Sequence, residues 1–257
     1  MYTWLDQLRT ALDQSVDPVV FFFRDDDVGW HDARLVALLD LFLRHAIPID
    51  LAVIPEALTQ SPATTLVDRC YAYPDLIGLH QHGFRHVNHE AIGRKSEFGL
   101  SRSSMEQLDD ISLGQRRLEL LLGAVLDPIF TPPWNRCTQA TVEALTTLGI
   151  QVLSREVKAT ALDLQHLQAL PVSVDWCKRH EGELRSPTEL STQIAQCVAI
   201  AQPVGIMLHH AVMQEQELTT SLKELLIMLS QHPKARCQLM RDVAQLAVED
   251  EVVMTRA

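Results

Sequence analysis

The sequence predicts an α/β fold, a distorted (β/α)7-type barrel that forms a single domain over residues 1–257. Two observations predict it: short apolar runs alternate with longer segments of helical periodicity, and about seven such units fit into 257 residues. That number of units favours a barrel over a short open sheet. An open doubly wound sheet stays as the alternative, because spacing alone does not show whether a sheet closes.

The apolar runs are expected to form parallel strands, and the periodic segments between them are expected to form the covering helices. The predicted strands are Val19–Phe23, Ile49–Ile54, Ile77–His80, Ile129–Thr131, Gln151–Leu153, Leu170–Val174 and Val204–Leu208. The predicted helices are Ala33–His45, Ala63–Tyr71, Ser103–Leu126, Thr138–Leu148, Thr188–Ala201 and Leu218–Leu229. The first residues, Met1–Arg9, predict a short amphipathic helix and not a secretion signal.

Helix-end signals support these elements. Ser103 precedes Glu106 by three residues, and Ser186 precedes Glu189 by three, which is the capping-box spacing. Gly149 follows the helix predicted to end at Leu148, where a left-handed residue is favoured.

Composition restricts the partners. The net charge is −11 and the pI is near 5.4, which argues against a nucleic-acid backbone and against an anionic membrane surface. The five scattered cysteines form no Cys-x-x-Cys pair, so a disulfide framework or thiolate zinc site is not expected. We therefore expect a cytoplasmic protein whose partner is a small molecule or an oligosaccharide; the sequence does not indicate an oligomeric state.

Two polar clusters directly follow predicted strands, and chemistry collects at the carboxyl ends of strands in parallel α/β folds. Asp25, Asp26 and Asp27 follow the first strand, and adjacent carboxylates repel unless a cation or a raised pKa relieves them. The segment His80–His89 follows the third strand and holds four of the eleven histidines. Imidazole is a common zinc ligand, so this segment predicts a metal site.

Two further clusters follow later strands. The stretch Thr131–Asn135 contains Pro133, Trp134 and Asn135, and the proline-stiffened turn predicts either a sugar subsite or a packed tryptophan. His209 ends the last predicted strand, which suits a general acid, a further metal ligand or a structural histidine.

Taken in chain order, these clusters resemble the motifs of the polysaccharide deacetylase (NodB-homology) family, as a divergent member. The family's Thr-Phe-Asp-Asp-Gly is matched by Arg24–Val28, its His-(Ser/Thr)-x-x-His by His82–His86, and its final strand motif by Leu208-His209. The resemblance spans Val19 to His210, nearly the whole predicted barrel.

The resemblance implies a role for each matched residue. Asp26 would be the catalytic base and His209 the acid, while Asp27, His82 and His86 would hold a divalent metal. That metal would be zinc by ligand type, although iron, cobalt, manganese and nickel also accept such ligands. The implied substrate-binding residues are Arg24, Pro133, Trp134, Asn135, Asp175 and Trp176. Backbone N–H groups near Trp134 and Asn135 would help to stabilise the oxyanion.

The sequence also departs from the family. Thr131 stands where the third family motif has arginine, so an arginine that orients the base must come from elsewhere, with Arg24 and Arg136 as the candidates. Val28 replaces the glycine of the first motif, and the additional Asp25 allows a second register for that motif.

The implied reaction is metal-dependent hydrolysis of a C–N amide bond, such as deacetylation of an N-acetylated sugar or glycan intermediate. Within enzymes, His80-x-His82 also resembles amidohydrolase-type metal motifs, and some relatives of the deacetylases cleave cyclic ureides. Outside enzymes, the lost arginine favours a pseudoenzyme that binds carbohydrate.

Overall fold

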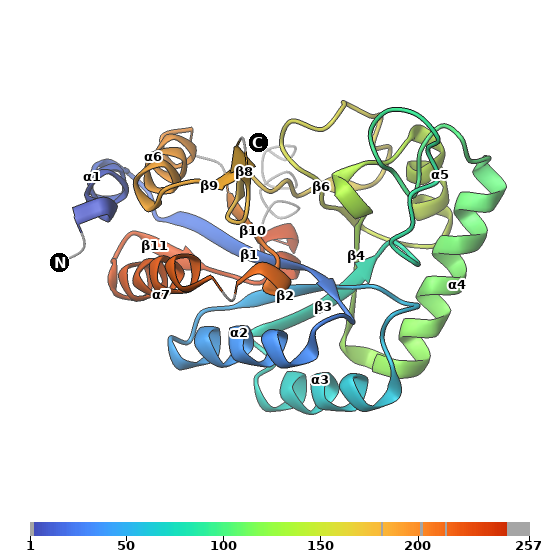
Figure 1. Cartoon of the computed structure of the whole chain (residues 1–257), viewed down its shortest axis with the longest axis horizontal. Coiled ribbons are helices and arrows are strands. Elements are labelled where there is room, and N and C mark those ends of the chain that lie inside the picture. Colours follow the sequence, from blue (N-terminus) through green and yellow to red (C-terminus); the bar gives the residue numbers. More distant parts are fainter. Residues whose placement is uncertain (1–2, 181, 201–202, 214, 246–257) are drawn as a thin grey trace, which may run out of the picture.

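A curved parallel sheet forms the centre of the molecule in the computed structural model, which describes residues 3–180, 182–200, 203–213 and 215–245 (Figure 1). The strands follow the order β6-β5-β4-β3-β2-β1-β10-β7. Their bounds are β1 Val19–Val28, β2 Ile49–Val53, β3 Ile77–His82, β4 Leu126–Thr131, β5 Val152–Leu153, β6 Gln168–Ala169, β7 Val174–Asp175 and β10 Val204–Leu208. A further strand, β11 (Ala235–Cys237), pairs with the first residues of β1.

One stretch of chain joins the two ends of this sheet. Residues 168–175 contain both β6 and β7. The N–H of Leu170 donates to Leu153 O of the β5 segment at 3.2 Å, and the N–H of Ser173 donates to Gly205 O of β10 at 2.8 Å. The sheet therefore curls into the distorted (β/α)7-type barrel that the sequence predicts, with 168–175 as its short seventh strand.

Helices cover the outside of the sheet, and α1 and α6 lie side by side at one end (Figure 1). The helices are α1 Asp6–Gln14, α2 Asp32–Arg44, α3 Gln60–Ala72, α4 Ser104–Leu122, α5 Gln139–Thr147, α6 Pro187–Val198 and α7 Gln216–Gln231, with 3-10 turns η1 Thr3–Leu5, η2 Gly123–Val125, η3 Pro133–Asn135 and η4 His210–Val212. The main core lies between these helices and the apolar faces of β1, β2 and β10. None of the described helices is long and apolar enough to cross a membrane.

Most predicted elements occur within a few residues of their expected bounds. Both capping boxes form, at Ser103 and Ser186, and Gly149 has a φ of 75°. The helix predicted to run to Leu126 ends at Leu122, because Gly123 adopts a φ of 63° and the chain then enters β4.

Three further differences remain. β1 is longer than predicted, so the three aspartates lie on the strand and not in a turn after it. β11 and the hairpin of β8 (Arg179–His180) and β9 (Glu183–Leu184) were not predicted, because two- and three-residue strands leave no periodic signal. The predicted ends Met1 and Ala201 lie outside the described residues.

A buried carboxylate at the amino ends of the strands holds the chain after β11 against the sheet. Asp50 on β2 accepts a hydrogen bond from the Met240 N–H at 2.9 Å, while its other oxygen has no hydrogen-bond partner among the described residues. Burial raises the pKa of Asp50 well above its usual value, and the Met240 hydrogen bond only partly opposes this. This end of a barrel lies opposite the usual site of chemistry, so Asp50 has a structural role.

The raised pKa of Asp50 predicts a pH-dependent stability. The folded state holds this proton more tightly than the unfolded state, so Asp50 lowers stability increasingly as pH rises above its unfolded pKa of about 4. Asp50→Asn keeps the acceptor for Met240 and removes the titration. We expect the free energy of unfolding in urea to fall less for this variant than for the wild type between about pH 5 and about pH 8. The exposed Asp75→Asn serves as the control, and an equal fall in all three proteins would contradict the prediction.

Candidate metal and catalytic site

The carboxyl ends of β1 and β3 bring three predicted metal ligands together. Asp27, His82 and His86 offer ligand atoms that all lie within 4.8 Å of one another. The Asp27 Oδ1 atom lies 3.3 Å from His82 Nε2 and 3.1 Å from His86 Nε2. Among the described residues, this is the one cluster of His, Cys, Asp and Glu with metal-site spacing.

The donor atoms of this cluster fit a cation. The Nδ1 of His82 lies 3.0 Å from the carbonyl oxygen of Thr131, which can only accept, so the proton of neutral His82 is on Nδ1. The lone pair of its Nε2 then faces the Asp27 carboxylate. Both His82 Nε2 and Asp27 Oδ1 are buried without a hydrogen-bond partner in the described structure. A positive ion bound between these atoms removes the repulsion between their electron pairs. In metal sites, the other ring nitrogen of a ligating histidine commonly donates a hydrogen bond to a backbone carbonyl, as His82 does here.

The Asp27 carboxylate is stabilised when positive charge is present in the cluster. Burial alone would raise the pKa of its carboxyl group, but protonated imidazoles at His82 and His86 would outweigh burial through hydrogen bonding and charge, and they lower that pKa far below its usual value. Asp27 is therefore ionised and can serve as a metal ligand at any physiological pH.

Left-handed backbone conformations recur at this site. Asp27, His86, Trp134 and Asn135 have φ values of 70°, 58°, 56° and 58°. Non-glycine residues rarely adopt such values, and they concentrate at functional sites when the surrounding fold enforces them. A register shift in the pairing of β1 with β2, between Asp25 and Val28, accompanies the turn of Asp27 towards the histidines.

Glu97 supports the turn that carries His86, and sequence reasoning did not identify it. Its buried carboxylate accepts hydrogen bonds from the backbone N–H groups of Phe84 at 3.2 Å and Arg85 at 2.7 Å. A Cβ on Gly83 would lie 2.2 Å from a Glu97 oxygen and 2.6 Å from Pro133, so the glycine permits this packing. The functional cluster thus extends into the long polar loop after β3.

Asp26, the predicted base, is held by Arg24 and not by an arginine of the third motif. The Nε and Nη2 atoms of Arg24 donate to the two carboxylate oxygens of Asp26 at 2.7 and 2.9 Å. Alternate residues of a strand share a face, which is why residues 24 and 26 meet. Of the two candidates, Arg24 orients the base, whereas Arg136 donates to the carbonyl oxygen of Lys95 at the surface.

Arg24 is itself fixed by residues from distant parts of the chain, one in η3 and one directly after β5. It is fully buried and donates to Ser154 Oγ and Asn135 Oδ1, each at 2.8 Å. Burial alone would raise the pKa of Asp26, but the charge of Arg24 outweighs it and lowers that pKa. Asp26 is therefore ionised, as a proton acceptor must be.

His209, the predicted acid, follows β10 on the same rim. It is half-buried, and its charge contributes to lowering the pKa values of Asp26 and Asp27. Asp175 at the end of β7 lies near it: burial raises the pKa of Asp175, and His209 is the strongest influence in the opposite direction. The structure therefore brings both predicted catalytic residues and Asp175 near one another at this rim.

Aromatic rings surround His86. The Trp134 ring lies 4.4 Å from the His86 ring, centroid to centroid, and the Trp30 ring lies edge-on at 5.2 Å. Trp134 is half-buried and Trp30 is 39% exposed, so both can face a bound molecule. Pro133 is buried beneath them and shapes the turn.

Two expectations about binding groups need correction. Trp176 is fully buried in the main core and its indole N–H donates to the carbonyl oxygen of Leu218 at 3.3 Å, so it packs the barrel and does not face a substrate. The N–H of Asn135 donates to the carbonyl oxygen of Pro132 at 2.9 Å, which is the internal hydrogen bond of the 3-10 turn η3. That N–H is therefore unavailable to an oxyanion.

Asp25 and His210, the chain neighbours of Asp26 and His209, pair with each other. His210 Nδ1 lies 2.6 Å from Asp25, and its Nε2 lies 2.6 Å from the carbonyl oxygen of Trp30. Burial alone would lower the pKa of His210, but Asp25 outweighs it and raises that pKa to about 9. This ion pair uses Asp25, so the register with Asp26 as base and Asp27 as ligand is favoured. No pattern in the sequence indicated that Asp25 and His210 would pair with each other.

His80 lies outside the ligand cluster. Its Nε2 lies 2.9 Å from Thr131 Oγ1, and burial lowers its pKa to about 3, so the ring is neutral. The geometry therefore pairs His82 with His86 and not with His80, which argues against the amidohydrolase-type alternative.

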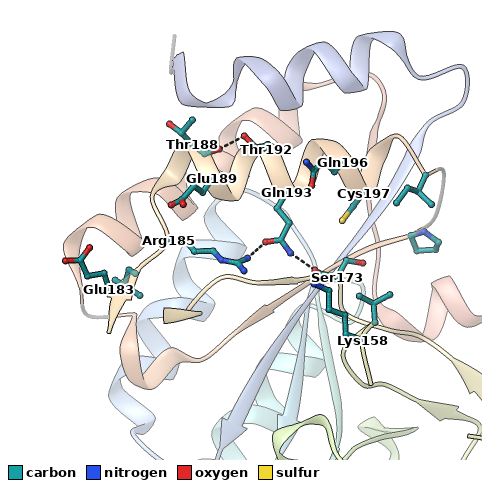
Figure 2. Close-up of a pocket in the computed structure, with 14 residues that line it drawn as sticks. Lys158, Ser173, Glu183, Arg185, Thr188, Glu189, Thr192, Gln193, Gln196 and Cys197 are labelled. Atoms are coloured by element: carbon teal, nitrogen blue, oxygen red, sulfur yellow. Dashed lines mark hydrogen bonds between the residues drawn. The ribbon is translucent and has the colours of Figure 1, made fainter. Parts of the chain in front are cut away.

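A large cavity lies away from this site. It has a volume of about 850 Å³ and lies against α6, where Arg185, Gln193 and Lys158 point towards it (Figure 2). The hydrogen bonds there, from Arg185 to Gln193 and from Gln193 to the Ser173 carbonyl, link its walls to each other. Volume alone thus does not locate the chemistry of this molecule.

No protein-family model and no curated protein matches this sequence. Solved structures do match its fold. A protein assigned as a polysaccharide deacetylase from Mycobacterium smegmatis has a TM-score of 0.71 at 14% identity, with 93% of each chain covered. An allantoinase has a TM-score of 0.62 at 10% identity, covering 88% of this chain and 89% of that one. A pseudoenzyme of the CE4 family from Bacillus anthracis has a TM-score of 0.60 at 13% identity, covering 89% and 66%. The chain thus has the fold of the CE4 polysaccharide deacetylases.

Proposed function

We propose that this protein is a metal-dependent hydrolase that cleaves a C–N amide bond, and that its substrate is an N-acetylated sugar or glycan intermediate. The observation that carries the proposal is the meeting of Asp27, His82 and His86 beside the ionised Asp26. One carboxylate and two imidazoles leave coordination positions open for water and substrate, which is the pattern of catalytic sites and not of closed structural sites.

The ligand set suits zinc, and iron, cobalt, manganese or nickel would also be accepted. A divalent ion bound there would polarise the acyl carbonyl and lower the pKa of a water molecule. A family 4 acetyl xylan esterase of the same fold contains a cobalt ion, which supports a metal in this position.

The protein side chains have distinct roles in the proposed reaction. Asp26 accepts the proton of the attacking water, and Arg24 keeps its carboxylate ionised and oriented. His209 donates a proton to the departing amine nitrogen, because an amine does not leave as its anion. Trp134 and Trp30 lie beside the metal ligands and offer faces for a sugar ring.

Two alternatives are weighed against this proposal: another hydrolytic activity and a pseudoenzyme. The similarity to an allantoinase favours a cyclic-ureide hydrolase as the second candidate, since it would use the same ligands on a different C–N bond. The pseudoenzyme alternative depended on the missing third-motif arginine. Arg24 supplies a guanidinium to the base at hydrogen-bond distance, which supports an active enzyme.

Removing a metal ligand should remove both the metal and the activity. We expect His82→Ala and His86→Ala to lower metal affinity by at least about 100-fold and to abolish hydrolysis of an aryl acetate, because two remaining ligands hold the ion poorly. Metal content measured by mass spectrometry on the purified proteins checks this. The exposed His89→Ala is the matched control and should keep its metal. Full metal content in either ligand variant would contradict the assignment.

Removing the base or the acid should have a different signature. Asp26→Asn and His209→Ala should retain the metal, while kcat falls by about 10²–10⁴-fold, because only proton transfer is lost. Metal analysis and steady-state kinetics on the same samples separate these variants from the ligand variants. If Asp26→Asn hydrolysed the substrate at the wild-type rate, Asp26 would not be the base.

Arg24 should act through Asp26 as a positioning residue. Arg24 lowers the pKa of Asp26, so Arg24→Gln should raise that pKa and shift the acidic limb of the kcat/KM profile to higher pH. Arg24→Lys restores a positive charge without the two-pronged contact and should return part of the shift. A profile that keeps its acidic limb in both variants would show that Arg24 has only a packing role.

A further inference from the structure

A second cavity adjoins the candidate site and is basic, although the protein is acidic. Its volume is about 300 Å³. The charged side chains that line it are Arg94, Arg136, Arg155, Lys158, Glu90 and Glu156. Four cations against two carboxylates contrast with the whole chain, in which 33 acidic residues exceed 22 basic ones.

The cations of this cavity are not neutralised by the protein. Within the described part of the chain, none of the four lies within 4.0 Å of a carboxylate. Of the two acids, Glu90 already accepts hydrogen bonds from Ser101. Burial lowers the pKa of Arg136 and the like charge of Arg94 lowers it further, while the charge of Glu156 opposes both. The two guanidinium groups repel each other and Glu156 offsets this only in part, so a bound anion would be favoured here.

The cavity is connected to the catalytic residues by a shared wall. Asn135 lines the cavity and also accepts the hydrogen bond from Arg24, which holds the base. Trp134, the residue before it, lies against His86, and the Lys95 ammonium lies 6.0 Å from the centre of the Trp134 ring. A molecule whose acyl group is at the metal ligands can thus extend past Trp134 towards the basic cavity.

We propose that this cavity is an anion subsite and that the substrate carries a phosphate group, so that the natural substrate is an acylated amino sugar bearing phosphate. This inference rests on the proposed function. Guanidinium groups match phosphate oxygens in geometry and charge, and a dianion gains more than a carboxylate from several converging cations. The cavity is large enough for a phosphate group with part of a sugar ring.

Binding of inorganic phosphate tests the subsite directly. The double variant Arg94→Gln with Lys158→Gln changes two exposed side chains that are outside the catalytic machinery. We expect it to weaken phosphate binding in isothermal titration by about tenfold or more, because two of the cations that would contact the anion are removed. The control, Arg116→Gln with Lys223→Gln, removes the same charge from exposed positions on α4 and α7 and should bind phosphate like the wild type.

A metal-site variant separates this inference from the proposed function. Phosphate could also bind to the metal, so the titration is repeated with His82→Ala. If phosphate binding is retained in His82→Ala and lost in the Arg94 and Lys158 double variant, the subsite is supported whether or not the protein is a hydrolase. Undetectable phosphate binding in the wild type, or equal affinity in the double variant and its control, overturns the subsite.

Kinetics then identify the substrate class. The KM for N-acetylglucosamine 6-phosphate or 1-phosphate should rise by about tenfold or more in the double variant, while the hydrolysis of an uncharged aryl acetate stays unchanged. Equal effects on the charged and uncharged substrates would show that the double variant disturbs the site as a whole and would contradict a phosphate contact.

Discussion

The organisation of the candidate site follows from the repulsion among three electron-pair donors. The Asp27 carboxylate faces the ring nitrogens of His82 and His86 at 3.3 Å or less, and the Thr131 carbonyl fixes the His82 proton on the far side of the ring. Such an arrangement is stable only with a positive charge at its centre, either a proton or a metal ion. The left-handed backbone of Asp27 and His86, the carboxylate of Glu97 and the glycine at position 83 all act to keep these donors together.

A second constraint is the position of Asp26, the proposed base, beside this cluster. Asp26 is adjacent to Asp27 in the chain, and Arg24 holds its carboxylate. The two carboxylates can thus remain ionised at the same time, one facing the histidines and the other facing a guanidinium. Arg24 in turn depends on Ser154 and Asn135, so residues far apart in sequence help to determine the protonation state of one aspartate.

These contacts show how Asp26 keeps a guanidinium partner without an arginine at position 131. The resemblance to the deacetylase motifs leads one to expect an arginine there, and the chain has Thr131. It contributes its hydroxyl to His80 and its carbonyl oxygen to His82. The guanidinium that contacts Asp26 comes from Arg24 on the same strand, where residues two apart share a face. The same turn, Pro133–Asn135, connects this network to the basic cavity through Asn135, so recognition and catalysis would share one wall.

The sequence by itself determined the parallel strands, most helices and their caps, because periodicity and capping chemistry are local. It also identified Asp27, His82 and His86 as a group, since their residue types follow strands whose carboxyl ends share one rim. Only the tertiary structure decided that Arg24 and not Arg136 holds Asp26, that Asp25 pairs with His210, and that Trp176 is buried in the core. The basic cavity likewise gathers residues from 94 to 158, which no local pattern relates. These features depend on which faces of distant strands and loops meet, and that is settled by closure of the barrel and not by spacing along the chain.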